Sequence, residues 1–255
     1  MSGIRLVLRA TAMAVLTCGW FAVWAIGMLV MAPIGRRLDW RDRCLHWWSA
    51  CLVRALGIRV TRDGPVPRGG CLLVANHLSY VDVAVLAAQR PLCFLSKADV
   101  QHWPVLGFMA RAIGVLFIER ENKRALPEVA ARLKRELDLG HCLVVFPEGT
   151  STGGSEVLPF RSSLLAPAAE GGLPVVHATL GYATPEGFPP ASRSVCWWGA
   201  MPFFPHLLGL FRLPRIEARV SFGETPLRHA DRKVLATRLR EGVLARFVPV
   251  EQGEG

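Results

Sequence analysis

A stretch without charged residues near the start of the chain constrains its fold most strongly. It runs from Ala10 to Gly35, about 26 residues, long enough for a helix to cross a lipid bilayer with some tilt. Arginines flank it on both sides: Arg5, Arg9, Arg36, Arg37, Arg41 and Arg43. A cleaved signal peptide is the alternative, but its apolar region is shorter, and a basic cluster directly after the stretch favours a retained anchor.

The flanking arginines also bear on how this stretch lies in a membrane. They are denser on its C-terminal side, and positively charged flanks tend to remain in the cytoplasm. We therefore expect the rest of the chain to face the cytoplasm. Because both flanks are positive, a hairpin within one leaflet, bent near Gly19 or Gly27, is the alternative to a full span.

The segment from Trp40 to Val60 continues the apolar character in a periodic form. Its apolar residues recur every three or four positions with arginines between them, which is typical of an amphipathic helix. We predict a helix that lies at the membrane interface. The alternative is an ordinary helix packed on the domain that follows. The periodic apolar residues are Leu45, Trp48, Cys51, Leu52 and Leu56.

Composition and charge indicate a lipid partner. Hydrophobic residues make up 51% of the 255 residues, which is high for a soluble domain and low for a transporter with many spans. The net charge of +10 favours anionic partners. Because the chain is also rich in hydrophobic residues, an anionic lipid is favoured over nucleic acid. Seven cysteines without C-x-x-C spacing argue against a disulfide framework or a zinc site and favour a reducing compartment. The basic residues are almost all Arg, with Lys only at Lys97, Lys123, Lys134 and Lys233, and Ala is frequent. This composition is typical of GC-rich bacteria, so we expect the bacterial inner membrane.

After Asp63 the pattern changes to short apolar runs that alternate with helical stripes. This alternation predicts an α/β fold, with a mixed, largely parallel sheet flanked by helices. We divide the chain into a membrane anchor and interfacial helix at 1–60 and a second domain at 61–255. The predicted strands are Cys71–Ala75, Cys93–Leu95, Val115–Ile118, Cys142–Phe146, Val175–Leu180, Val195–Trp198 and Ile216–Phe222, and the predicted helices are Tyr80–Ala88, Leu126–Leu137 and one capped by Asp231.

The sharpest local signal is the segment NHLSYVD at 76–82, directly after a predicted buried strand. On a regular helix, residues five apart do not face each other. His77 and Asp82 can meet only if His77 lies in the turn and Asp82 in the first helical turn, with Ser79 as the N-cap. A carboxylate on one imidazole nitrogen leaves the other nitrogen as a base for a hydroxyl. The alternative is a histidine that merely completes a turn.

Three further segments complete a set of four blocks. They are GVLFIER at 114–120, FPEGTS at 146–151 and LPVV at 173–176. Together, over about Val60 to Phe222, the four blocks resemble the glycerolipid acyltransferase family, whose best-known members are 1-acylglycerol-3-phosphate (lysophosphatidic acid) acyltransferases. The resemblance implies a membrane-bound enzyme of phospholipid biosynthesis. It would transfer a fatty acyl group from acyl-CoA or acyl-carrier protein to the free hydroxyl of a lysolipid, most simply 1-acylglycerol-3-phosphate, without a metal or other cofactor.

The resemblance also implies roles for individual residues. His77 and Asp82 match the catalytic pair of the family. Arg120 suits a phosphate or carboxylate because its guanidinium is a permanent cation with a planar fork. Glu148 would accept a hydroxyl or orient Arg120. The residues expected to bind the acceptor are Arg120, Glu148, Gly149, Thr150 and Arg161.

The chain departs from the family pattern at several positions. His177 stands where many relatives have a second proline. After Arg161 the family pattern has a small residue or glycine, where this chain has Ser162-Ser163. The third block ends Thr150-Ser151 instead of Thr-Arg, which removes one possible phosphate contact. A lyso-ornithine lipid acyltransferase, which shares the four blocks, is therefore the alternative to a lysophosphatidate enzyme.

The expected mechanism is direct transfer. His77 deprotonates the lysolipid hydroxyl, the oxygen attacks the thioester carbonyl, and backbone N–H groups near Gly149 are candidates to hold the oxyanion. One alternative is a serine esterase, because Gly149–Gly153 matches the G-x-S-x-G pattern with Ser151 as nucleophile. The other alternative is a catalytically inactive, membrane-associated scaffold with the same fold.

Overall fold

The fold is built around one sheet of seven strands. The computed structural model describes residues 2–31, 33–35, 37–97, 101–102, 107, 110–111, 115–118 and 126–252. The strands are ordered β1-β7-β6-β2-β5-β3-β4, and β6 and β7 pair antiparallel, whereas the other neighbours pair parallel. This confirms the predicted mixed, largely parallel α/β fold. The strands are β1 (Ile58–Asp63), β2 (Cys71–Ala75), β3 (Cys93–Lys97), β4 (Leu116–Ile118), β5 (Cys142–Val145), β6 (Val175–Ala183) and β7 (Ile216–Phe222).

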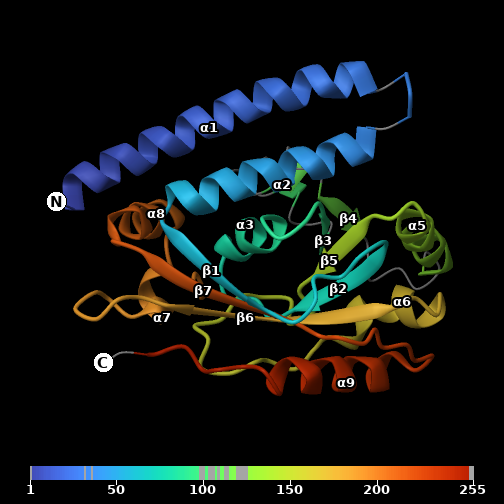
Figure 1. Cartoon of the computed structure of the whole chain (residues 1–255). Helices are drawn as coiled ribbons and strands as arrows, with labels where there is room; N and C mark the ends of the chain where they lie inside the picture. Colours follow the sequence, from blue (N-terminus) through green and yellow to red (C-terminus); the bar gives the residue numbers. More distant parts are fainter. Residues whose placement is uncertain are drawn as a thin grey trace.

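Helices cover both faces of the sheet, with α3, α2 and α1 above it and α9 below it in the view of Figure 1. Successive side chains of a strand point to opposite faces, so both faces of a covered strand must be apolar. In β2, Leu73 and Ala75 belong to one apolar cluster, and Leu72 and Val74 belong to the other. The helices are α1 (Ser2–Met31), α2 (Arg37–Ala55), α3 (Val81–Ala87), α5 (Leu126–Asp138), α6 (Ala166–Glu170), α7 (Ala191–Ser194), α8 (Phe203–Arg212) and α9 (Arg232–Leu244).

Helix α1 contains most of the uncharged stretch and is long and apolar enough to cross a bilayer. It runs along α2, and its first turns contact α8 (Figure 1). Arg9 is buried, and its guanidinium donates to the carbonyl oxygens of Leu213 at 2.6 Å and Pro214 at 3.1 Å, just beyond the end of α8. Arg5 donates to the carbonyl of Arg212. These arginines therefore bind the carbonyl end of another helix, where cations are favoured.

Helix α2 packs on the domain that follows it. This is the arrangement that we gave above as the alternative to a helix at the membrane interface. Leu45, Leu52 and Leu56 join the core together with residues of α3. The helix ends at Ala55, not near Val60, because Gly57 adopts a positive φ of 68° and turns the chain into β1. Strand β1 begins at Ile58, within the segment that we assigned to the anchor.

The strand predicted at Val195–Trp198 is wrong. The backbone N–H groups of Val195 and Cys196 both donate to the carbonyl of Ala191, so the residues continue the turn of α7. Their side chains are fully buried without joining the sheet. A short apolar run indicates burial, but it does not distinguish a strand from a buried turn. The capped last helix is confirmed, because Asp231 accepts hydrogen bonds from the backbone of Lys233 and Val234.

Candidate active site

The loop that carries His77 follows β2, in the middle of the sheet. Parallel pairing of β2 with β5 and with β6 places the loops after β2 and β5 side by side, and β6 continues past the end of β2. Asn76 fixes the start of the loop to this extension of β6. Its buried amide donates to the Leu180 carbonyl at 2.9 Å and accepts from the Leu180 N–H at 2.7 Å.

His77 and Asp82 form a hydrogen-bonded pair. The distance from His77 Nδ1 to Asp82 Oδ2 is 2.7 Å, and the Asp82 side chain is fully buried whereas that of His77 is 23% exposed. An ionised carboxylate only accepts hydrogen bonds, so Nδ1 carries the proton, and Nε2 is the nitrogen that can act as a base. The ring of His77 stacks on Phe146 at 4.1 Å between centroids, which holds its plane.

The carboxylate of Asp82 is held by four donors. Its Oδ2 also accepts from the backbone N–H groups of Leu78 at 2.7 Å and Ser79 at 3.0 Å. Its Oδ1 accepts from the hydroxyl of Tyr182 at 2.7 Å. The predicted N-cap at Ser79 is wrong: α3 begins at Val81, and no partner is found for the buried Ser79 hydroxyl among the described residues. Asp82 itself satisfies the N–H groups that precede the helix.

Glu148 approaches the same loop from the end of β5. It is almost fully buried, and its Oε1 accepts from the His77 N–H at 2.7 Å, while its Oε2 accepts from the Leu158 N–H at 2.8 Å. Burial raises the pKa of Glu148 to about 7, against the effect of its two amide donors. Both oxygens are thus engaged in positioning backbone around the histidine. Contact of Glu148 with the acceptor stays a prediction.

Gly149 and Arg161 lie together beside this turn. Gly149 has a positive φ of 75°, and a Cβ at this position would lie 2.8 Å from the Arg161 Nε. The Arg161 N–H donates to the Pro147 carbonyl, and the residue is exposed. Thr150 is also exposed. The N–H of Gly149 donates to the Phe146 carbonyl and that of Thr152 to the His77 carbonyl, so these two are not free to hold an oxyanion.

Comparison with known proteins places this site in a family. A model of the family described as Acyltransferase matches residues 57–180. The lyso-ornithine lipid O-acyltransferase of Pseudomonas aeruginosa is 34% identical over 95% of this chain and 93% of its own length. The 1-acyl-sn-glycerol-3-phosphate acyltransferase of Neisseria gonorrhoeae is 32% identical over 52% of each chain. The chain belongs to the glycerolipid acyltransferase family.

A solved structure supports the fold of this acyltransferase. The crystal structure of the 1-acyl-sn-glycerophosphate acyltransferase from Thermotoga maritima superposes with a TM-score of 0.65 over 96% of this chain and 97% of that chain, at 19% sequence identity. Membership of this family confirms the predicted general activity, that of an O-acyltransferase that acts on a lysolipid at a membrane.

The serine motif of this acyltransferase does not form a nucleophile elbow. The elbow needs a strand that runs into the serine and a helix directly after it. Here 147–150 form turns and bends, 151–153 lack regular structure, and the Ser151 hydroxyl donates to the Trp197 carbonyl at 2.5 Å. Arg120, the predicted headgroup ligand, lies in 119–125, outside the described residues.

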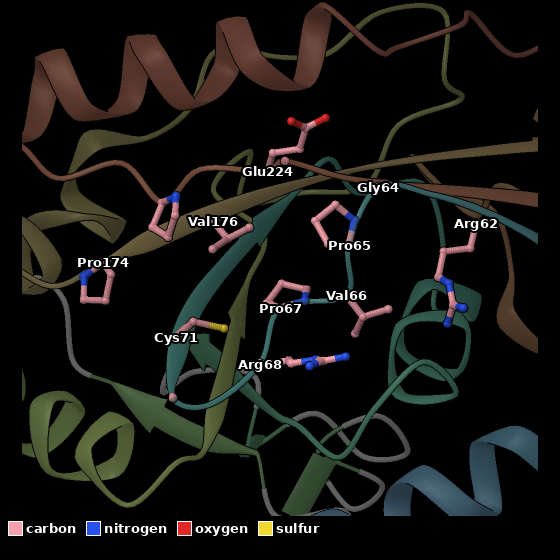
Figure 2. A pocket seen from close by; sticks show the side chains of 13 residues that line it. Arg62, Gly64, Pro65, Val66, Pro67, Arg68, Cys71, Pro174, Val176 and Glu224 are labelled. Atoms are coloured by element: carbon pink, nitrogen blue, oxygen red, sulfur yellow. The ribbon is translucent and has the colours of Figure 1, made fainter.

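A cavity of about 640 Å³ opens at the opposite end of the sheet (Figure 2). Cys71, the first residue of β2, and Val176, near the start of β6, line it. His77 lies two residues past Ala75, the last residue of β2, and is therefore at the other end of that strand. The cavity therefore does not contain the His77–Asp82 pair.

Proposed function

We propose that this acyltransferase transfers a fatty acyl group from a thioester to the hydroxyl of a lyso-ornithine lipid. One observation carries this choice of acceptor. The lyso-ornithine lipid enzyme of P. aeruginosa aligns with 95% of the chain, including the segments outside the four blocks, whereas the lysophosphatidate enzyme of N. gonorrhoeae aligns with 52%. The Thr150-Ser151 ending of the third block agrees with this choice, because one possible phosphate contact of the family pattern is missing.

The proposed chemistry follows from the hydrogen bonds of His77. Nε2 takes the proton of the acceptor hydroxyl as its oxygen attacks the thioester carbonyl, and the buried Asp82 stabilises the imidazolium that forms. The tetrahedral intermediate then breaks its C–S bond, and the imidazolium returns the proton to the leaving thiolate. No acyl-enzyme forms, and the reaction as proposed needs no metal or other cofactor. Its donor is acyl-CoA or acyl-carrier protein.

Arginines are the proposed ligands of the acceptor headgroup. Arg161 is exposed beside Gly149, next to the turn that holds His77, and Arg120 is proposed to join it. A guanidinium binds a carboxylate, such as that of ornithine, as well as a phosphate. The second candidate acceptor is therefore 1-acylglycerol-3-phosphate, which the identity of 32% to the N. gonorrhoeae enzyme favours.

We also propose that α1 lies along one leaflet of the bacterial inner membrane, with the sheet on the cytoplasmic side. Its outer face exposes large apolar side chains, whereas Arg9 on its inner face is buried against the end of α8. A helix fully inserted across the bilayer would break these hydrogen bonds or bury the arginine in lipid, which is costly. The exposed apolar side chains of α1 include Ile4, Leu8, Val15, Ile26 and Leu29.

The test is acyl transfer by the purified full chain in lipid vesicles. Radiolabelled acyl-CoA and acyl-carrier protein are each supplied with lyso-ornithine lipid or with 1-acylglycerol-3-phosphate. We expect diacylated ornithine lipid as the preferred product. Phosphatidic acid as the preferred product would instead assign the second candidate. A lack of transfer with every pair by wild type would favour the inactive scaffold.

A serine variant separates the two catalytic mechanisms. In the proposed direct transfer, Ser151→Ala keeps most of its activity, because the hydroxyl of Ser151 is bonded to a backbone carbonyl. An esterase would lose its activity in this variant and would form an acyl-serine that mass spectrometry detects in wild type.

A further inference from the structure

Tyr182 reaches the catalytic aspartate from a strand far away in sequence. Oδ2 of Asp82 has three donors, whereas Tyr182 is the one donor to Oδ1 within the described part of the chain. Both side chains are buried, Asp82 completely. A buried carboxylate oxygen that loses its donor pays the full cost of desolvation. The hydroxyl of Tyr182 therefore helps to hold Asp82 in its buried orientation.

The sheet explains why Tyr182 stands at this point. Ala75, the last residue of β2, pairs with Ala178 of β6, so the following residues of β6 extend past β2 and along the catalytic loop. Leu180 and Tyr182 are two apart on the extended strand. The backbone of Leu180 holds Asn76 at the start of the loop, and the side chain of Tyr182 holds Asp82 at its end. One strand thus fixes both ends of the segment that carries His77.

We propose that Tyr182 is a positioning residue of the acyl-transfer reaction, which fixes Asp82 Oδ1 and takes up part of the negative charge that the carboxylate presents to His77. This inference rests on the proposed roles of His77 and Asp82. Burial, together with the charge of Asp82, raises the pKa of Tyr182, so its hydroxyl stays protonated and remains a donor at the pH of the reaction.

The chain offers a matched control, because it contains two tyrosines, Tyr80 and Tyr182. The hydroxyl of Tyr80 is hydrogen-bonded to His206 Nδ1 at 2.9 Å on α8, and burial raises its pKa too. Tyr80→Phe therefore removes a hydrogen-bonded, half-buried tyrosine hydroxyl whose partner is not Asp82. Moreover, Tyr182 is the single remaining tyrosine in Tyr80→Phe, so a tyrosine analogue fed to cells modifies Tyr182 alone.

The first arm of the experiment compares Tyr182→Phe with Tyr80→Phe in vesicles. For Tyr182→Phe we expect kcat per folded enzyme to fall about 10- to 100-fold, from the loss of a hydrogen bond to a charged group, with KM for both substrates little changed. The carboxylate then presents more charge to the imidazole, which holds its proton more tightly. The acidic limb of the kcat/KM profile should therefore move to higher pH. Tyr80→Phe should keep the wild-type profile.

The second arm replaces Tyr182 by 3-fluorotyrosine in the Tyr80→Phe background. This analogue keeps the ring and its packing, but its hydroxyl is a stronger donor that draws more charge from Asp82. We expect the acidic limb to move to lower pH, opposite to Tyr182→Phe. This arm also decides the question if Tyr182→Phe fails to fold.

The outcomes distinguish the role of Tyr182 from the proposed reaction at His77. Unchanged kcat and unchanged acidic limbs in Tyr182→Phe and in the fluorinated enzyme would overturn the role of Tyr182. A lower melting temperature with an unchanged pH profile would do the same, because it would show a structural role only. In both cases the proposed reaction stands. If His77→Ala keeps full activity, the reaction mechanism itself fails instead.

Discussion

Replacement of Asp82 by asparagine tests the electrostatic part of the mechanism without rebuilding the site. Oδ2 of Asp82 faces two backbone N–H groups and the imidazole, so an amide nitrogen cannot occupy that position. The amide oxygen of the Asp82→Asn side chain must lie there, and its NH₂ group then faces Tyr182, whose hydroxyl can accept a hydrogen bond. The variant therefore keeps the fold, the imidazole orientation and the Nδ1–H tautomer, and it loses the negative charge.

The size of the loss follows from the distance between the two groups. Unit charges at the observed 2.7 Å attract by roughly 6 kcal/mol at an effective dielectric constant of about 20. Proton transfer is incomplete in the transition state, so part of this attraction is lost. With about 1.4 kcal/mol for each factor of ten, we expect kcat to fall by roughly 10²- to 10⁴-fold, with KM little changed.

The assay is acyl transfer in vesicles, with the folded fraction measured for each variant. Asp42→Asn is the matched control. Asp42 also forms a hydrogen bond to a histidine, His141 Nδ1, at 3.0 Å, and both of these side chains are buried. That control should lower stability and leave kcat per folded enzyme unchanged. If Asp82→Asn retained more than a tenth of wild-type kcat, the negative charge of Asp82 would not be what stabilises the His77 imidazolium in the reaction.

Three further predictions concern the acceptor, the pH dependence of stability and the membrane. Arg120→Lys should raise KM for the acceptor and leave KM for the donor unchanged, because an ammonium cannot reproduce the guanidinium fork; steady-state kinetics with each substrate varied in turn will check this. Hydrogen bonding to Asp42 raises the pKa of His141, so its stabilisation is complete below about pH 6.5 and is lost as pH rises through the higher folded-state value. Melting curves in detergent should show this decline in wild type and not in His141→Ala. High salt should leave the full chain on sedimented membranes, because the apolar face of α1 holds it there without charge; complete release would contradict the anchor.

Much of the site was predictable because its chemistry lies in one short segment. The buried strand before His77 and the spacing to Asp82 require a turn followed by a helix, and the structure brings the two side chains together. Alternation of apolar runs with helical stripes predicted the sheet and all but the first of its strands. The end of α2 and the start of β1 were missed because apolar residues continue on both sides of Gly57. The change of backbone direction at this glycine does not show in the apolar pattern.

Contacts between segments far apart in the chain could not be predicted from local patterns. Tyr182 meets Asp82 across 100 residues, and His141 meets Asp42 across 99. Neither spacing leaves a trace in the sequence, since the packing of α2 and α3 against the sheet decides which side chains meet. The two backbone hydrogen bonds of Glu148 were missed for the same reason. Its hydrogen bonds to His77 and Leu158 depend on where two loops lie beside β5.

The most direct test of the account is the acyl-transfer rate of His77→Ala in vesicles that contain lyso-ornithine lipid and an acyl thioester. A general base typically contributes about 10²- to 10⁴-fold, so we predict at least a hundredfold loss of kcat. Membrane binding and the melting temperature should stay close to wild type, because the His77 side chain is part-exposed and bonds to Asp82 alone among the hydrogen bonds described. A folded His77→Ala enzyme with wild-type kcat would contradict the central claim.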